Sequence, residues 1–147
     1  MNLYKLIIFI LISLTTPLSL KTFSQTCRIK IATMNNGNDV YTEVFENDFV
    51  DDKPEFPGGR NSLINYINKN RIYPHEAYEN GIEGRVTCSF VVDENGKISH
   101  VQILRGVEPS LNNEAMRIVS NMPDWVPGKI DNHPVPVRVI CCIPFRK

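Results

Sequence analysis

The segment from Tyr73 to Val86 combines side chains that could act as acids, bases or metal ligands. Its sequence, YPHEAYENGIEGRV, holds one histidine, three glutamates and two tyrosines. Histidine and carboxylate groups bind zinc and serve in general acid–base catalysis. However, His75, Glu76 and Glu79 do not follow the His-Glu-x-x-His spacing that places two histidines on one helical face. Since we expect the face shared by the two glutamates to be solvated, we assign no metal site and no catalytic residue.

Backbone requirements explain the same segment better. Pro74 suits the first helical position, and Gly81 suits the position that follows the last turn. Glu76 in the first turn would interact favourably with the helix dipole. The segment therefore predicts a short helix that leads through Gly84 into a strand beginning near Val86.

The four cysteines are the other candidates for chemistry. No two are spaced as Cys-x-x-Cys, and the zinc-finger spacings are missing. Cys88 and Cys141 fall on the inward-facing sides of two strands that we expect to be neighbours, so a disulfide and a pair of buried thiols both remain open. A nucleophilic cysteine needs a neighbouring base, and the sequence places no histidine beside either residue.

Charge and missing motifs narrow the function further. The chain carries 16 basic and 16 acidic side chains without a basic patch, which argues against nucleic acid as a partner. There is no Gly-x-Ser-x-Gly motif and no Gly-rich phosphate loop. We therefore predict no enzyme activity, no cofactor and no small-molecule substrate.

Residues 1–24 are typical of a secretory signal peptide. Lys5 precedes an apolar run over residues 6–14, and a polar segment with small residues ends at Ser24. We predict cleavage before Gln25 and export to the periplasm, where cysteines can pair. The alternative is an uncleaved inner-membrane anchor that faces the periplasm.

Periodicity predicts the elements that position these residues. Residues 25–53 are predicted to be an N-terminal extension or linker with one edge strand in DVYTEVFE (residues 39–46), and residues 54–147 the domain. Within the domain we expect a helix over 61–69, the short helix after Pro74, a hairpin turning at Asn95-Gly96, a helix over 109–122 and a last strand over 135–145. Ser110 is the expected N-cap of the third helix. Trp125 is expected to cover the end of the core.

These elements predict an α+β fold in two layers. A hairpin, a crossover helix and a third strand give a three-stranded antiparallel sheet in the order 2-1-3, with the helices on one face. Prolines at alternate positions of the last strand cannot donate hydrogen bonds to a neighbour, which places this strand at an edge.

Several segments together resemble a known family. PEFPGG, YPHEAYENGIEGRV, SFVVDENGKISHVQILRG, PSLNNEAMRIVSNMPDWVPGK and PVPVRVICCIPF are similar to the C-terminal domain of TonB energy transducers of the Bacteroidetes type. The resemblance covers Pro54 to Lys147. It implies a TolA/TonB C-terminal-like fold and a periplasmic domain without enzyme activity. It also implies that the third strand grips the TonB box, a short segment of an outer-membrane transporter, while force from a proton-driven complex opens the transporter.

The resemblance suggests a binding site on the last strand. An edge strand exposes unpaired N–H and C=O groups to which an extended peptide can add. The predicted partner-binding residues are Val137, Arg138, Val139, Ile140 and Cys141. Edge strands could also join two copies into a homodimer.

The N-terminal part departs from a complete transducer. About 35 residues separate the apolar run from the first helix, and even fully extended they reach at most about 120 Å. The apolar run also lacks the ionisable residue expected in a helix that couples to a proton-driven motor. We therefore predict an exported binding domain. The alternatives are a short membrane-anchored transducer and a small periplasmic enzyme that uses a cysteine or a histidine.

Overall fold

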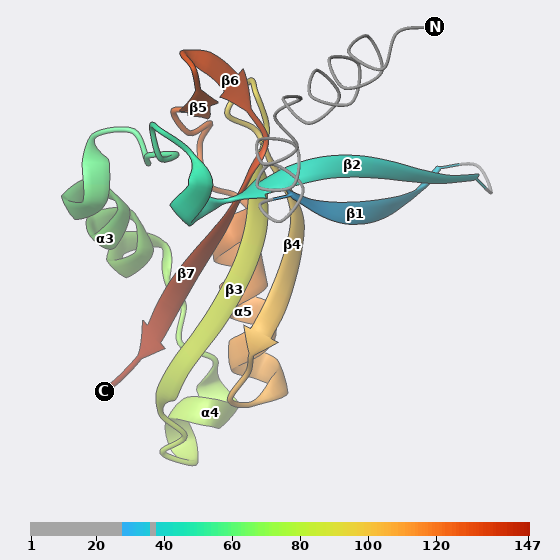
Figure 1. Cartoon of the computed structure of the whole chain (residues 1–147). Coiled ribbons are helices and arrows are strands. Elements are labelled where there is room, and N and C mark those ends of the chain that lie inside the picture. The colour runs from blue at the N-terminus through green and yellow to red at the C-terminus, as the bar shows by residue number, and fades with distance from the viewer. Residues whose placement is uncertain (1–27, 36–37) are drawn as a thin grey trace, which may run out of the picture.

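The computed structural model describes residues 28–35 and 38–147. The predicted signal peptide, its cleavage site and Cys27 lie outside this part of the chain. The described residues form three α-helices, one 3-10 helix and seven strands, of which five make a main sheet and β5 and β6 a small second one (Figure 1). In chain order they are β1 (Arg28–Asn35), β2 (Asn38–Glu46), η1 (Asn47–Phe49), α3 (Gly59–Asn70), α4 (His75–Glu79), β3 (Gly84–Val92), β4 (Ile98–Arg105), α5 (Pro109–Ser120), β5 (Gly128–Ile130), β6 (His133–Val135) and β7 (Val137–Phe145).

The main sheet has five strands in the order β1-β2-β7-β3-β4. β3 lies between β4 and β7 and is antiparallel to both, so the predicted 2-1-3 arrangement of these three strands is confirmed. The prediction of a three-stranded, wholly antiparallel sheet is wrong. β1 and β2 form a further hairpin, and β2 joins β7 in parallel through Phe45 opposite Val137 and Glu46 opposite Arg138. Consequently β2 is not the edge strand expected from DVYTEVFE.

The alternation of side chains along β3 and β7 places one face of each strand in the core. The buried inward residues are Val86, Cys88, Phe90 and Val92 of β3 and Val137, Val139, Cys141, Ile143 and Phe145 of β7. Ile67 of α3, Ala77 of α4 and the apolar stripe of α5 pack against this face. The helices therefore cover one face of the sheet, as predicted, and burial of this apolar surface is the main force that holds the two layers together.

The ends of the elements follow local chemistry, with three departures from prediction. Helix α5 begins at Pro109, and the carboxylate of Glu108 accepts hydrogen bonds from the N–H groups of Ser110 and Leu111. Glu108, and not Ser110, is therefore the N-cap. Pro74 is the N-cap of α4 and precedes its first helical residue.

The hairpin turn between β3 and β4 is the third departure. A two-residue turn at Asn95-Gly96 requires positive φ at both residues, but only Gly96 has positive φ, at 84°. Asp93 Oδ1 accepts hydrogen bonds from the N–H groups of Asn95 and Lys97, both at 2.8 Å. The aspartate side chain thus stabilises a longer turn, because it accepts hydrogen bonds from the two N–H groups inside that turn.

The candidate binding edge

Two hydrogen bonds establish which residues of β7 turn their backbone groups away from β3. Phe45 N–H donates to the carbonyl of Pro136 at 2.9 Å, and Arg71 Nη1 donates to the carbonyl of Pro144. Along a strand the direction of the N–H and C=O groups alternates from residue to residue. The even-numbered residues from Pro136 to Pro144 therefore direct their backbone groups outward, while the odd-numbered residues exchange hydrogen bonds with β3.

The outward side of β7 is occupied at both ends. β2 pairs with Val137 and Arg138, and Arg138 Nη2 lies 2.6 Å from Glu46 Oε1. At the other end, the guanidinium of Arg71 donates a hydrogen bond to the outward carbonyl of Pro144. Between them, the outward N–H and C=O groups of Ile140 and Cys142 have no hydrogen-bond partner among the described residues. We call this stretch, Ile140–Cys142, the open edge.

The five predicted binding residues have different positions relative to this edge. The prediction that they form a free edge strand is wrong for Val137 and Arg138, because β2 pairs with them. Val139 and Cys141 are buried on the core side and pair with β3. Ile140 lies on the open edge with 55% of its surface exposed. Cys142, which the prediction did not include, is also exposed and forms the other end of the open edge.

Sequence reasoning brought Cys88 and Cys141 together correctly, as they are directly opposite each other in the register of β3 and β7. Both are free thiols in this structure. Burial, and secondarily the neighbouring cysteines, raises the pKa of Cys88 to about 11 and that of Cys141 to about 12, so both thiols are protonated and weakly nucleophilic at neutral pH. A hydrogen-bonded antiparallel pair has Cα atoms about 5.5 Å apart, which a disulfide can span. The disulfide and the pair of buried thiols stay the two alternatives predicted from the sequence.

The polar residues that first suggested chemistry lie apart from the open edge. The side chain of His75 is 89% exposed, and its Nε2 is 3.9 Å from Glu79 Oε1. No group of three or more histidine, cysteine or acidic side chains is placed to hold a metal ion in the described part of the chain. Trp125 is buried against Phe56 and Phe90, as predicted, and its rings meet theirs edge to face.

An open pocket of about 560 Å³ adjoins the open edge. The lining of this arginine pocket combines four arginines with apolar surface: Arg60, Ile64, Arg71, Arg85, Cys142, Pro144 and Arg146. The arginines come from α3, the segment after it, β3 and the C-terminal end. Sequence reasoning missed this pocket because its residues are far apart in the chain, and only the fold brings them together.

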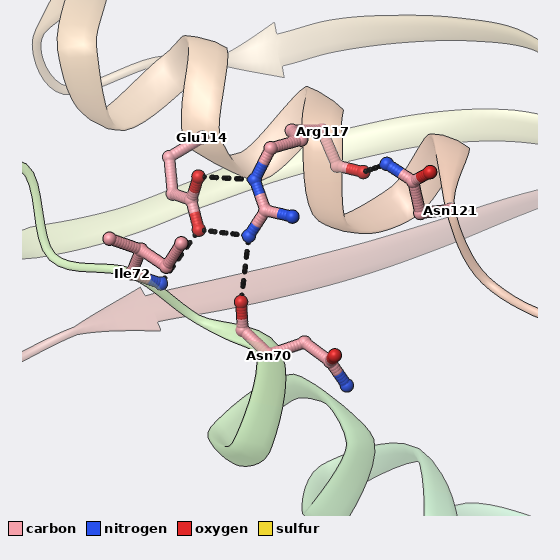
Figure 2. A network of polar contacts seen from close by, with 5 residues as sticks. All are labelled: Asn70, Ile72, Glu114, Arg117 and Asn121. Atoms are coloured by element: carbon pink, nitrogen blue, oxygen red, sulfur yellow. Dashed lines mark hydrogen bonds and ion pairs between the residues drawn. The ribbon is translucent and has the colours of Figure 1, made fainter.

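An ion pair between buried Glu114 and half-exposed Arg117 holds the segment that carries Arg71. The Glu114 carboxylate, on α5, accepts hydrogen bonds from Arg117 Nε at 2.7 Å and from Ile72 N–H at 2.7 Å (Figure 2). Arg117 Nη2 also donates to Asn70 O at 2.7 Å. Burial alone would raise the pKa of Glu114, but the hydrogen bonds from Arg117 and Ile72 and the charge of Arg117 outweigh it and hold the pKa below its usual value. Glu114 thus joins α5 to the connection between α3 and α4.

The described residues include no helix with the length and hydropathy needed to cross a membrane. A family model for the C-terminal part of the Gram-negative bacterial TonB protein matches residues 69–146, just over half of the chain. No curated protein matches the chain significantly.

Two solved structures are similar to the chain, both NMR solution structures of the Helicobacter pylori TonB C-terminal domain. One, of residues 194–285, is 20% identical with a TM-score of 0.43, and the match covers 58% of this chain and 89% of that one. The other, of residues 179–285, is 20% identical with a TM-score of 0.40 and coverages of 62% and 88%.

Proposed function

Since the chain belongs to the family of Gram-negative bacterial TonB protein C-terminal domains, we propose that it binds a segment of an outer-membrane transporter by strand addition at the open edge. Family membership implies a role in TonB-dependent transport. In this proposal the domain works in the periplasm, has no enzyme activity, and contacts a TonB-box-like peptide. The observation that supports it most is the pair of residues Ile140 and Cys142, whose outward backbone groups have no partner strand within residues 28–35 and 38–147.

The open edge is short, but all of its outward backbone groups are available to a peptide. Two N–H and two C=O groups face outward from Ile140 and Cys142, and an extended peptide can pair with all of them. Each hydrogen bond contributes a net ~0.5–1.5 kcal/mol. The backbone alone therefore supports weak, reversible binding, and side-chain contacts have to supply the rest. The exposed side chain of Ile140 offers one such contact.

The outward direction of the even-numbered residues also explains Pro136, just before β7, and Pro144 within it. Pro136 and Pro144 occupy outward positions, where a missing N–H group does not weaken the pairing with β3. A proline at position 140 should be tolerated for the same reason, whereas a proline at Val139 would remove a hydrogen bond to β3 and disrupt the fold.

Substitution Ile140→Pro is accordingly the sharpest test of strand addition. It removes one outward N–H group that a bound peptide needs, and we expect binding to fall about tenfold or more. Fluorescence anisotropy with labelled peptides from the N-terminal segments of transporters encoded in the same genome would measure it. Ile140→Val retains the N–H group and is the matched control, and circular dichroism checks that both variants fold. If Ile140→Pro is folded and binds the peptides as tightly as the unaltered protein does, the proposal is wrong.

A further inference from the structure

We propose that Cys88 and Cys141 form a disulfide in the exported protein, and that this bond fastens the strand with the open edge to the centre of the sheet. This inference rests on the periplasmic location in the proposed function, because disulfides form and persist in oxidising compartments. It adds a covalent modification and its effect on β7, neither of which follows from strand addition itself.

The register places the two thiols within bonding range. Cys88 and Cys141 are directly opposite each other in the β3–β7 ladder and both face the core, with 0% and 7% of their surfaces exposed. Because the odd-numbered residues of β7 exchange hydrogen bonds with β3, this is a hydrogen-bonded pair, in which opposite Cα atoms lie about 5.5 Å apart. Disulfides join residues whose Cα atoms are about 4.4–6.8 Å apart. The two strands are therefore already spaced for a bond between these sulfurs.

The sheet separates Cys142 from this pair. Successive side chains of a strand point to opposite faces, so the side chain of Cys142 lies on the other face of the sheet from that of Cys141. Cys142 is opposite Thr87, and Thr87 Oγ1 is 3.6 Å from Cys142 Sγ. Of the three cysteines that the structure describes, Cys88 and Cys141 are thus the two that share a face.

The bond forms by two successive exchanges with the disulfide of a thiol–disulfide oxidoreductase. One thiolate of the protein attacks a sulfur of that disulfide, which gives a mixed disulfide and releases one thiolate of the oxidant. The second thiolate of the protein attacks the protein sulfur of the mixed disulfide and displaces the other thiolate of the oxidant. The protein disulfide has then formed, the disulfide of the oxidant is reduced, and the two protons lost by the protein thiols end on the thiols of the oxidant.

Burial determines when this exchange can take place. It raises the pKa of Cys88 to about 11 and that of Cys141 to about 12, while the attacking species is an accessible thiolate. Oxidation should therefore precede the closure of β7 onto β3. Once the sheet has closed, the same burial shields the disulfide from reductants.

Cys141 lies in the middle of the open edge, Ile140–Cys142, so the bond holds the stretch to which a partner adds. Within the described part of the chain, β3 is the one strand that pairs with this stretch, since β2 reaches only Val137 and Arg138. A strand paired on one side separates from the sheet once its hydrogen bonds to that neighbour open. A partner bound to the outward groups pulls on this stretch, and a bond from Cys141 to Cys88 prevents the separation without touching the partner.

Peptide mapping of the full-length exported protein, taken from the periplasm, tests the bond. Free thiols are blocked with iodoacetamide in urea, and the protein is then cut with trypsin without reductant. Trypsin leaves Cys88 in residues 86–97 and both Cys141 and Cys142 in residues 139–146. We expect these two peptides to be joined in the unaltered protein and equally in Cys142→Ser, the matched control. Separate peptides with blocked thiols in the unaltered protein, or loss of the link in Cys142→Ser, would overturn the proposed pairing.

Hydrogen exchange measures the effect of the bond on β7. The N–H groups of Val139, Cys141 and Ile143 are directed toward β3. They should exchange about tenfold or more slowly in the oxidised protein than in protein that was reduced in urea and refolded with reductant. Loop closure between residues 88 and 141 should also raise the melting temperature by about 10 °C or more. If the bond is present but these N–H groups exchange at the same rate in both forms, it does not fasten β7. Neither measurement involves a peptide, so a failure here is distinct from a failure of the open edge to bind one.

Discussion

At the scale of single residues, Glu114 shows how a buried charge supports the open edge. Its carboxylate joins α5 to Ile72 and Arg117, and the same short connection carries Arg71, which closes one end of the open edge. Loss of one partner in a buried, hydrogen-bonded charge network leaves other groups unsatisfied. Substitution of Glu114 should therefore lower the stability of the fold. It should also shift Arg71, and with it the end of the open edge.

The substitution Glu114→Gln should lower the free energy of unfolding at pH 7 by about 1–3 kcal/mol. Because the folded-state pKa of Glu114 is held below its value in the unfolded chain, its contribution is present above about pH 4.3 and is lost as the pH falls through the folded-state pKa. Urea unfolding at pH 7 and near pH 3 would show the difference between variant and unaltered protein shrinking in acid. Glu94→Gln, in the exposed hairpin turn, is the control. An equal difference at both pH values would contradict the assignment.

Two glycines with similar backbone angles differ in their surroundings. A Cβ at Gly96 would lie 1.9 Å from the backbone oxygen of Trp125, whereas a Cβ at Gly81 would have nothing within 4 Å. Both residues have positive φ, so alanine at either is strained by about 1–2 kcal/mol. Gly96→Ala should be much more destabilising than Gly81→Ala, because it also breaks the contact that seats Trp125 over the core. Thermal unfolding of the two variants compares them, and similar melting temperatures would refute this role for Gly96.

At the scale of elements, patterns within one segment predict which face of a strand or helix is buried. The alternation along β3 and β7 and the apolar stripe of α5 predict the core face of each element, and the predicted position of Trp125 at the core is confirmed by its burial. The N-cap of α5 is harder to predict, because the side chains of Ser110 and Glu108, two residues apart, can both accept hydrogen bonds from the first N–H groups of the helix. The choice depends on where the helix starts, and Pro109 at the first position decides it.

Pairing between distant strands could not be read from the sequence. β2 attaches to β7 through only Phe45 and Glu46, and no periodicity in either strand indicates that contact. The predicted edge, Val137 to Cys141, therefore begins three residues before the open edge, and it also ends one residue short of Cys142. The arginine pocket escaped prediction for the same reason, since its four arginines approach one another only when α3, β3 and β7 are assembled.

At the scale of the whole molecule, the β1–β2 hairpin determines how much of β7 a partner can reach. Figure 1 shows the hairpin projecting from the sheet at the start of β7. Val44 is fully buried and the Glu46–Arg138 ion pair is partly buried, so β2 is held by packing as well as by backbone hydrogen bonds. A partner peptide that extends past Ile140 toward Arg138 therefore meets β2.

Removal of this hairpin should lengthen the open edge. A chain that starts at Asn47 frees the outward groups of Arg138, so peptides long enough to pair with residues 138–142 should bind severalfold tighter, by one or two additional hydrogen bonds of ~0.5–1.5 kcal/mol each. A chain that starts at Asn38 lacks β1 but retains β2 on β7 and is the matched control. Isothermal titration with a short and a long peptide separates the effects, since the short one, limited to Ile140–Cys142, should bind all three proteins alike. Circular dichroism and melting curves must first show that the shortened chains fold. If the longer peptide gains no affinity in the folded chain that starts at Asn47, β2 does not limit the open edge.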